Sequence, residues 1–375
     1  MVMMSAVPQR TDVFVVGGGP AGLAAAIAAR RQGFRVTVAD VFRPPIDKAC
    51  GEGLMPDSVA ALRELGLDLD DLDTGAFRGI RFIGDEGVVE ADFPHGRGVG
   101  IRRTLLHQAL VQGAQDAGVT MLWGARVAAA RDGAVLVEGR AVPCGWIIGA
   151  DGHNSQVRRW AGLSGEREFD RRLGVRLHFA IEPWSEYVEI YWGEHNQAYV
   201  TPIGTREVCV ALLSRQPVSD FASALQEFPA LRRRLGAAHT TTEMKGAVTV
   251  TRKLKSVARG RFALVGEASG SSDAITGAGL AMSFRQAIAL ARALAADNLS
   301  LYQAAHDDIR RLPHFMGRTM LLMDQRPWVR RRALRALAAK PGLFRQLLAV
   351  HVGELSLLKF AIPGFLDLGW EILTA

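Results

Sequence analysis

The chain has 375 residues, of which 49% are hydrophobic, so it can bury a large core and is not a disordered protein. Its formal net charge of +7 is accompanied by no nucleic-acid recognition motif, which argues against a nucleic-acid partner. The three cysteines, Cys50, Cys144 and Cys209, have neither metal-ligand spacing nor an even disulfide framework, so we expect a reducing, cytoplasmic location and no metal site.

The N-terminal segment has the pattern of a dinucleotide-binding strand, turn and helix. An apolar strand that begins at Asp12 runs into a turn with glycines at Gly17, Gly19 and Gly22, followed by an alanine-rich helix. Such glycines permit a tight turn, close approach of a pyrophosphate and close packing of helix on strand. A second predicted strand ends at Asp40, at the spacing where a carboxylate accepts hydrogen bonds from a ribose.

Two later motifs indicate that this nucleotide is FAD. The first is a buried strand followed by an Asp-Gly turn at Asp151 and Gly152. The second is a strand that leads into a glycine turn at Gly266 and Glu267, and then into a long apolar helix. A protein that bound only NAD would need no such additional cofactor signals. We therefore predict that the two turns contact a flavin nucleotide.

With these three motifs, residues 10–300 resemble the flavoprotein superfamily of p-hydroxybenzoate hydroxylase-like monooxygenases, flavin-dependent halogenases and geranylgeranyl reductases. The resemblance implies that Asp151 and Gly152 lie beside FAD and that Glu267 accepts a hydrogen bond from the ribityl chain. It also implies that Gly277 and Gly279 open a helix aimed at the flavin. The N-terminus of such a helix would stabilise the negative charge of reduced flavin.

Two further segments resemble cofactor contacts of the same superfamily. Residues 100–110 match its Arg-x-x-Leu-x-x-x-Leu helix start, which implies that Arg103 contacts the cofactor, with Arg102 as the alternative register. The run from Cys50 and Gly51 resembles the Cys-Gly-Glu-Gly segment of archaeal geranylgeranyl reductases, which borders the flavin. A glycine loop with one buried thiol is the structural alternative.

The expected fold class is α/β, with a Rossmann-like, GR2-type FAD-binding domain, an inserted antiparallel β-sheet substrate domain and a helical C-terminus. We expect the FAD-binding domain to be discontinuous and the sheet to roof the flavin. The predicted boundaries are 8–66, 100–165 and 256–300 for the FAD-binding domain, 67–99 and 166–255 for the substrate domain, and 301–375 for the C-terminal region.

Candidate substrate residues come from alternating strands in the second insert. Residues 173–181 alternate apolar side chains with Arg176 and His178. The strands that follow carry Tyr187, Tyr191, Trp192, His195 and Tyr199. Aromatic and basic groups of this kind suit a planar or phenolic substrate, although each one is also an ordinary sheet residue.

The C-terminal region combines cations with an apolar helical pattern, and two arrangements suit it. The helices can pack on the core with solvated arginines, or they can lie peripherally on an anionic bilayer at the inner face of the membrane. We find no secretory leader and no apolar run of membrane-spanning length. The cations are Arg326, Arg330, Arg331, Arg332, Arg335 and Lys340, and the apolar residues include Leu347, Leu348, Leu355, Leu357, Leu358, Phe360 and Phe365.

The sequence favours an FAD-dependent monooxygenase that hydroxylates or epoxidises a lipophilic, aromatic or polyketide-like small molecule through a flavin C4a-hydroperoxide, with NAD(P)H as transient reductant. His178, Tyr191 and Tyr199 are the candidate proton-relay residues. The main alternative is a reductase that saturates prenyl double bonds, in which Cys50 would take part. The remaining alternative is a flavoprotein that binds its ligand without turnover.

Overall fold

Strand β1 (Thr11–Val16) lies in the centre of a mainly parallel sheet, as its run of buried β-branched and aromatic residues predicts. It pairs in parallel with β2 (Val36–Asp40) and β11 (Arg140–Gly149). The computed structural model describes residues 6–85, 87–131, 133–165 and 167–356. The other strands of this sheet are β8 (Thr120–Trp123), β9 (Val127–Arg131), β10 (Ala134–Val137), β17 (Ala258–Arg259) and β18 (Phe262–Leu264).

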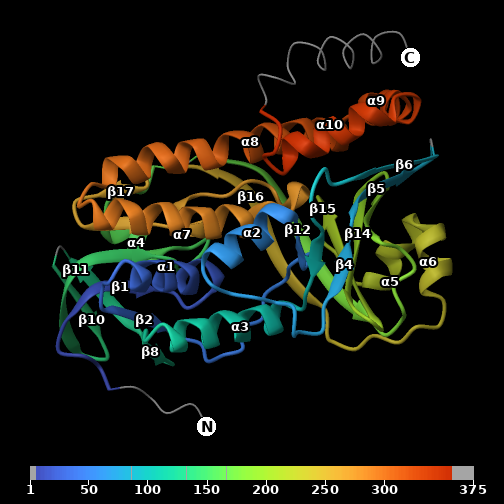
Figure 1. The fold of residues 1–375 in the computed structure, drawn as a ribbon. Helices are drawn as coiled ribbons and strands as arrows, with labels where there is room; N and C mark the ends of the chain where they lie inside the picture. Colours follow the sequence, from blue (N-terminus) through green and yellow to red (C-terminus); the bar gives the residue numbers. More distant parts are fainter. Residues whose placement is uncertain (1–5, 86, 132, 166, 357–375) are drawn as a thin grey trace.

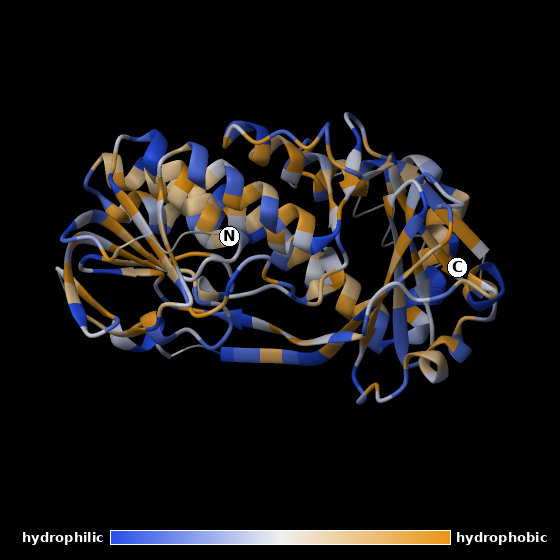
Figure 2. Cartoon of the chain, turned by 90° about the horizontal axis from the view of Figure 1, so that it is seen from below, coloured by the Kyte–Doolittle hydropathy of each residue, from blue (hydrophilic) through white to orange (hydrophobic). Residues whose placement is uncertain are grey.

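Helix α1 (Pro20–Arg31) packs against α7 (Gly279–Ala295) and α3 (Arg103–Asp116). Its residues from Leu23 to Ala29 are buried, and six of these seven are alanine or leucine, which have high helix propensity. The small alanine side chains let neighbouring helices approach closely. Figure 2 shows hydrophobic residues on the strands and helices of this part of the molecule. The result is the predicted Rossmann-like α/β unit.

A second sheet of seven strands contains both inserts of the sequence (Figure 1). It is mostly antiparallel, as the sequence predicted, with one parallel pair between β13 (Tyr187–Trp192) and β5 (Gly79–Gly84). Because β5 and β13 belong to different inserts, no tight turn forces them to run in opposite directions. The other strands are β6 (Gly87–Asp92), β12 (Arg167–Phe179), β14 (Asn196–Gly204), β15 (Glu207–Ser214) and β16 (Lys245–Lys253).

Shorter elements connect the two sheets. A three-stranded sheet is formed by β3 (Gly53–Leu54), β7 (Gly98–Gly100) and β4 (Gly75–Phe77), and β5 and β6 of the second sheet come between β4 and β7 in the chain. The remaining helices are α2 (Pro56–Glu64), α4 (Gln156–Trp160), α5 (Phe221–Ala224), α6 (Pro229–Leu235), and the 3₁₀ turns η1 (Leu225–Glu227), η2 (Gly266–Ser269) and η3 (Ala274–Thr276).

Helix α8 (Leu299–Gln325) joins the two sheets. Near its start, the hydroxyl of Tyr302 donates a hydrogen bond to the Leu264 carbonyl of the first sheet at 2.6 Å. Near its end, Asp324 accepts a hydrogen bond from Gln197 of the second sheet at 3.0 Å. The helix therefore fixes the distance between the sheets.

The C-terminal helices α9 (Pro327–Ala339) and α10 (Pro341–His351) pack on the second sheet beside β6. Their inner residues, such as Val329, Leu337 and Phe344, are buried. Of the two arrangements that the sequence allowed for this region, these residues therefore show packing on the core. Among the described residues, no helix has the length and apolarity required to cross a bilayer. Leu357, Leu358, Phe360 and Phe365 lie outside the described residues.

A buried ion pair between Arg172 of β12 and Asp273 provides a test of this arrangement. Both side chains are at most 1% exposed, so Arg172→Met leaves a buried carboxylate without its partner. We expect the free energy of unfolding to fall by about 3–5 kcal/mol, measured by urea denaturation of the flavin-loaded protein. The control is Arg171→Met at the adjacent exposed position of the same strand, where we expect little change. Equal urea midpoints for the two variants would contradict the importance of the pair.

Candidate active site

A cavity of about 950 Å³ is lined by both sheets and by α8, α9 and α10. One part of it is formed by the glycine loops that follow β1, β11 and β18, whose carboxyl ends meet at one edge of the parallel sheet. Ligands of open α/β sheets bind at this edge. The other part is formed by apolar side chains of the second sheet and the C-terminal helices.

The loop after β1 has the close approaches that its glycines predict. A Cβ at Gly17 would lie 2.4 Å from the Ala150 oxygen, and a Cβ at Gly22 would lie 1.9 Å from the Gly17 oxygen. At Gly19, in contrast, a Cβ would have nothing within 4 Å, and this residue lines the cavity. The N-terminus of α1 therefore faces open space, as an anion site at a helix N-terminus requires.

Asp40 lies at the end of β2 and also lines the cavity. Its carboxylate accepts a hydrogen bond from the Gly18 N–H at 2.6 Å and from the Phe42 N–H at 2.8 Å. Each oxygen uses one lone pair in these bonds and keeps another for a ligand hydroxyl. The predicted ribose contact is thus compatible with the geometry.

The structure distinguishes the two arginines at the start of α3. Arg102 is paired with Glu207 and donates to Thr241 at 3.0 Å. Arg103 lines the cavity, and its Nε is buried without a hydrogen-bond partner among the described residues. Of the two registers, only that of Arg103 places a guanidinium at the cavity.

Asp151 and Gly152 lie at the cavity, but the carboxylate of Asp151 has a local function. It accepts hydrogen bonds from the Ser155 hydroxyl at 2.5 Å and from the Gln156 N–H at 2.6 Å, at the start of α4. Asp151 therefore shapes the turn. Gly152, with a φ of +76°, adopts the left-handed conformation that favours glycine.

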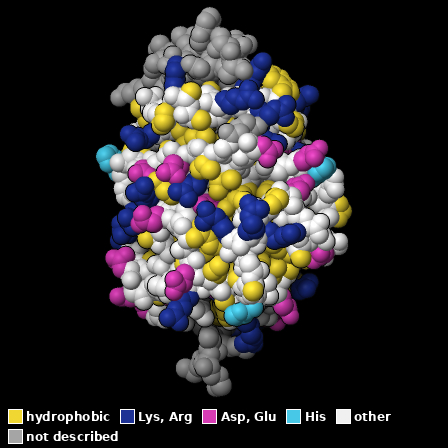
Figure 3. Space-filling model, turned by 90° about the vertical axis from the view of Figure 1, so that its right-hand side faces the viewer, with side chains coloured by type: hydrophobic (Ala, Val, Ile, Leu, Met, Phe, Trp, Pro, Cys, Tyr) yellow, Lys and Arg dark blue, Asp and Glu magenta, His cyan; other side chains and the backbone are white. Residues whose placement is uncertain are grey.

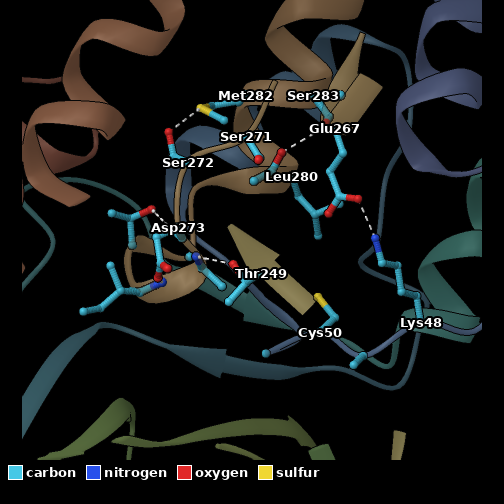
Figure 4. Close-up of a pocket in the computed structure, with 18 of the residues that line it drawn as sticks. Lys48, Cys50, Thr249, Glu267, Ser271, Ser272, Asp273, Leu280, Met282 and Ser283 are labelled. Atoms are coloured by element: carbon cyan, nitrogen blue, oxygen red, sulfur yellow. Dashed lines mark hydrogen bonds and ion pairs between the residues drawn. The ribbon is translucent and has the colours of Figure 1, made fainter. Parts of the chain in front are cut away.

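Glu267 projects from η2 into the cavity, where Lys48 Nζ lies 2.6 Å from its carboxylate (Figure 4). Burial would raise the pKa of Glu267, but Lys48, with smaller contributions from His153 and Arg103, holds it below its ordinary value. Glu267 is thus an anionic acceptor at neutral pH. The adjacent Gly266 also lines the cavity.

The loop before α7 opens toward the same space. Gly277 ends η3 in the left-handed conformation with a φ of +64°, and Gly279 begins α7. A Cβ at either position would have nothing within 4 Å, and both residues line the cavity. The N-terminus of α7 can therefore be approached closely by a ligand with partial negative charge.

Cys50 and Gly51 line the cavity between these loops. Burial raises the pKa of the Cys50 thiol, and the nearby Arg103 guanidinium opposes this change. The thiol is consequently protonated at neutral pH. The Gly51 carbonyl accepts a hydrogen bond from Thr201 at 2.8 Å, which holds the loop against β14.

Among the predicted catalytic tyrosines, Tyr199 lines the cavity and Tyr191 does not. Tyr199 donates to the Ile275 carbonyl at 3.1 Å, and burial raises its pKa well above the usual tyrosine value. Tyr191 lies on the other face of the sheet, because neighbouring strand residues point to opposite faces, and donates to Glu189 at 2.7 Å. Tyr187, Trp192 and His195 are also absent from the cavity lining.

His178 does not line the cavity itself, but it contacts Glu52, which does. Its Nε2 lies 2.6 Å from the Glu52 carboxylate. The Glu52 and His178 ligand atoms and Cys209 Sγ lie within 4.8 Å of one another, as in a potential metal site. The Arg103 N–H at 2.8 Å and Arg176 Nε at 3.8 Å already compensate the carboxylate, which favours a hydrogen-bonded cluster over a cation site.

The apolar part of the cavity is lined by side chains from four regions. His351 is an exception to this apolar character: its Nε2 lies 3.1 Å from the Thr276 carbonyl, and its Nδ1 is buried without a hydrogen-bond partner among the described residues. The apolar residues include Ile80, Phe82, Val188, Ile190 and Leu213 of the second sheet, Met316, Met320 and Met323 of α8, Val329, Ala333 and Leu337 of α9, and Phe344, Leu347 and Leu348 of α10.

The polar part of the cavity fits FAD. It offers an open helix N-terminus at Gly19, an unpartnered guanidinium nitrogen on Arg103 and a second open helix N-terminus at Gly279. Asp40 and Glu267 supply carboxylate acceptors at separate positions. These are the donors and acceptors that a pyrophosphate, two sugar-like chains and a flavin ring require.

Comparison with known proteins identifies the family. A family model described as FAD binding domain matches residues 10–299. The protein therefore belongs to the FAD-binding domain family and is an FAD-dependent oxidoreductase of the monooxygenase, halogenase and reductase superfamily.

Individual relatives differ in their reactions. A menaquinone reductase of Mycobacterium tuberculosis (strain ATCC 25618 / H37Rv) is 34% identical over 235 residues, which cover 56% of this chain and 58% of that protein. A hispidin-3-hydroxylase of Neonothopanus nambi is 30% identical over 173 residues, covering 42% and 41%. A digeranylgeranylglycerophospholipid reductase of Methanothrix thermoacetophila is 28% identical over 316 residues, covering 78% and 79%. The match thus spans little more than half of the mycobacterial relative.

The fold is confirmed by a solved structure. A flavoprotein/dehydrogenase from Cytophaga hutchinsonii superposes with a TM-score of 0.78 at 18% identity, covering 91% of this chain and 92% of that one.

Sequence reasoning missed three polar residues at the cavity. Lys48 and Glu52 flank Cys50 in the chain, so their proximity was available, but their partners Glu267 and His178 are more than 100 positions away. His351 carried no signal, because it follows the helical pattern of the C-terminal region.

The open space at Gly19 leads to a direct test. A valine at this position meets no protein atom but occupies the space next to the α1 N-terminus, so we expect Gly19→Val to fold and to lose its flavin. Flavin absorbance and far-UV circular dichroism measure the two properties, and chromatography of the released flavin identifies FAD. Gly342→Val, at an open position remote from this loop, serves as control. Full flavin content in Gly19→Val would disprove the assignment of the loop.

Proposed function

We propose that this protein is an FAD-dependent reductase that saturates carbon–carbon double bonds of a polyprenyl-type lipid. The observation that carries the proposal is the position of the protonated Cys50 thiol, between the flavin-binding loops and a long apolar extension of the cavity. The relatives named as menaquinone reductase and digeranylgeranylglycerophospholipid reductase support it.

The shape and lining of the cavity favour a long hydrophobic chain over a small phenol. Residues of α8, α9 and α10 add to the lining, and most of them are aliphatic or methionine. Burial of each methylene group of a substrate in such surroundings contributes about 0.8 kcal/mol. Of the aromatic and basic residues that the sequence suggested for a phenolic substrate, only Tyr199 lines the cavity.

Cys50 would act as the proton donor. Reduced FAD, when bound, would supply a hydride to one carbon of the double bond. The Cys50 thiol would give its proton to the other carbon, so that the double bond becomes a single bond and a thiolate remains. Because burial raises the pKa of the Cys50 thiol, the thiol stays protonated at neutral pH and can donate its proton during the reaction.

The electron donor in this proposal is NAD(P)H. FAD would occupy the glycine loop after β1, so the nicotinamide nucleotide would bind transiently and leave after the flavin is reduced. Glu267 and Lys48 would hold the ribityl side of FAD, and Arg103 would hold its pyrophosphate.

A monooxygenase, the function that the sequence alone favoured, is the second candidate. The relative named hispidin-3-hydroxylase supports it, as does the Tyr199 hydroxyl at the cavity wall. The two reactions differ in their requirement for oxygen. A reductase adds two hydrogen atoms to its substrate and needs no O₂, whereas a monooxygenase consumes O₂ and adds one oxygen atom to its substrate.

We expect the reduced, flavin-loaded protein to hydrogenate a geranylgeranyl lipid under strictly anaerobic conditions, with mass spectrometry of the product as the measurement. Cys50→Ala should keep its FAD and lose turnover by roughly 100-fold or more, the usual contribution of a general acid. Cys144→Ala replaces a buried cysteine outside the cavity lining and should retain activity. Product formation only with O₂, from a lipophilic phenol and not from the lipid, would reject the reductase and support the monooxygenase.

We further propose that the outer face of α9 holds the protein at the cytoplasmic surface of an anionic membrane, next to the lipid-binding part of the cavity. Arg331 and Arg335 are exposed, and so is Trp328, at 53%. Figure 3 shows basic side chains beside hydrophobic ones near the top of the face that includes α9. Cations and an indole ring are typical of helices that lie at a bilayer interface.

Co-sedimentation with anionic vesicles tests this surface. Each cation near such a membrane contributes about 1 kcal/mol, so we expect the double variant Arg331→Gln/Arg335→Gln to bind roughly 30-fold more weakly. The matched control, Arg131→Gln/Arg140→Gln, removes two exposed charges from the β9–β11 hairpin region at the other end of the molecule. No preference of the intact chain for anionic over neutral vesicles would reject the membrane proposal.

A further inference from the structure

Three side chains form a hydrogen-bonded chain from the Cys50 side of the cavity to the protein surface. Glu52, which lines the cavity, lies with its carboxylate 2.6 Å from His178 Nε2. His178 Nδ1 lies 3.0 Å from Thr242 Oγ1. Glu52 and His178 are 2% and 1% exposed, whereas Thr242 is partly exposed. The chain therefore crosses a buried region and ends at solvent.

The neighbouring Arg176 assigns the direction of these hydrogen bonds. Its Nη1 lies 3.4 Å from both His178 Nδ1 and Thr242 Oγ1. A guanidinium only donates, so Nδ1 is the accepting nitrogen and the ring proton resides on Nε2, which donates to Glu52. The Thr242 hydroxyl can then donate to Nδ1. All three groups are aligned for transfer from the surface inward.

Glu52 and Cys50 are joined at the inner end of the chain. The backbone N–H of Glu52 donates to Cys50 Sγ at 3.4 Å, and the positive φ of Glu52, 59°, folds the two residues tightly together. A non-glycine residue in this conformation is uncommon and marks a constrained position. The negative charge of the Glu52 carboxylate also raises the pKa of the Cys50 thiol, so the two groups interact electrostatically.

We propose that Thr242, His178 and Glu52 form a proton relay that restores the Cys50 thiol after each turnover. This inference rests on the proposed reductase function. A long apolar substrate would separate Cys50 from bulk water, and a buried thiolate without a proton source is unfavourable. A proton path through the protein would supply the buried thiolate with a proton from solvent.

The relay would carry one proton from solvent water to the Cys50 thiolate. Water gives a proton to the Thr242 hydroxyl as the hydroxyl proton moves to His178 Nδ1. The Nε2 proton moves to the Glu52 carboxylate, and the resulting carboxylic acid gives its proton to the Cys50 thiolate. One proton is moved inward and no electrons are transferred. His178 is left protonated on Nδ1 and returns to its starting tautomer before the next transfer.

The charges around the relay are already paired, which keeps it in place. Arg176 pairs with Asp47 at 2.5 Å, and the backbone N–H of Arg103 donates to Glu52 at 2.8 Å. A replacement at Thr242 changes none of these pairs. The titratable and charged groups that face the relay are Asp47, Cys50, Arg102, Arg103, Arg176, Glu207 and Cys209.

Thr242→Val removes the outer hydroxyl with little change in volume and is the variant for the test. In flavin-loaded protein labelled with ¹⁵N-histidine, NMR measures how fast the His178 Nε2 proton exchanges with water, and no substrate is needed. We expect exchange to slow at least tenfold in Thr242→Val and to recover in Thr242→Ser. Thr240→Val, at a nearby exposed threonine, is the matched control and should exchange at the normal rate.

Steady-state reduction of a geranylgeranyl lipid is the second measurement. Thr242→Val should lower turnover about tenfold and increase the solvent deuterium isotope effect, because reprotonation becomes rate-limiting. Unchanged Nε2 exchange in Thr242→Val would overturn the path, and unchanged turnover despite slowed exchange would overturn its role in restoring Cys50. If the wild-type protein reduces no polyprenyl lipid, the proposed function fails, while the exchange measurement still decides whether Thr242 connects His178 to solvent.

Discussion

The buried ion pair between Arg172 and Asp273 connects the two halves of this molecule, and the shape of the cavity depends on it. Arg172 belongs to β12 of the second sheet, whereas Asp273 precedes η3 and caps it by accepting the Ile275 N–H at 2.9 Å. The same arginine lies 3.5 Å from Asp324 near the end of α8. A single guanidinium thus joins the roofing sheet, the flavin-side loop and the longest helix. A buried pair of this kind adds more to the choice of one arrangement than to net stability.

With the proposed reductase function, the cavity has to satisfy two opposite requirements. A charged pyrophosphate needs N–H donors and a cation, whereas a lipid chain needs surroundings from which water is excluded. The protein separates them along one space. Helix N-termini and Arg103 lie at the parallel sheet, and α8, α9 and α10 supply aliphatic side chains at the far part. Cys50 lies between the polar and the apolar parts of the cavity. Its burial there raises the pKa of the thiol, which is therefore neutral although cationic groups lie nearby.

The polar cluster behind Cys50 shows how the loop that carries this residue is supported from the second sheet. Glu52 comes from the loop before β3, and His178 and Arg176 come from β12, yet their contacts form one hydrogen-bonded group. The second sheet is therefore more than a cover over the flavin. It contributes buried charges that fix the loop carrying the thiol, and its strand β14 holds the same loop through Thr201 and the Gly51 carbonyl.

The sequence alone determined the nucleotide-binding half, because the functions of Gly17, Gly19, Gly22 and Asp40 follow from local backbone geometry over a few residues. It also determined that Arg176 and His178 share one face of a strand, since strand periodicity is two. Only the tertiary structure decided that this face meets Glu52, that Arg103 and not Arg102 reaches the cavity, and that Tyr191 lies on the opposite side of its sheet. It also decided that α9 and α10 complete the apolar part of the cavity. These contacts join segments more than 100 residues apart, and their register is set by side-chain packing between the sheets, for which a single sequence contains no local signal.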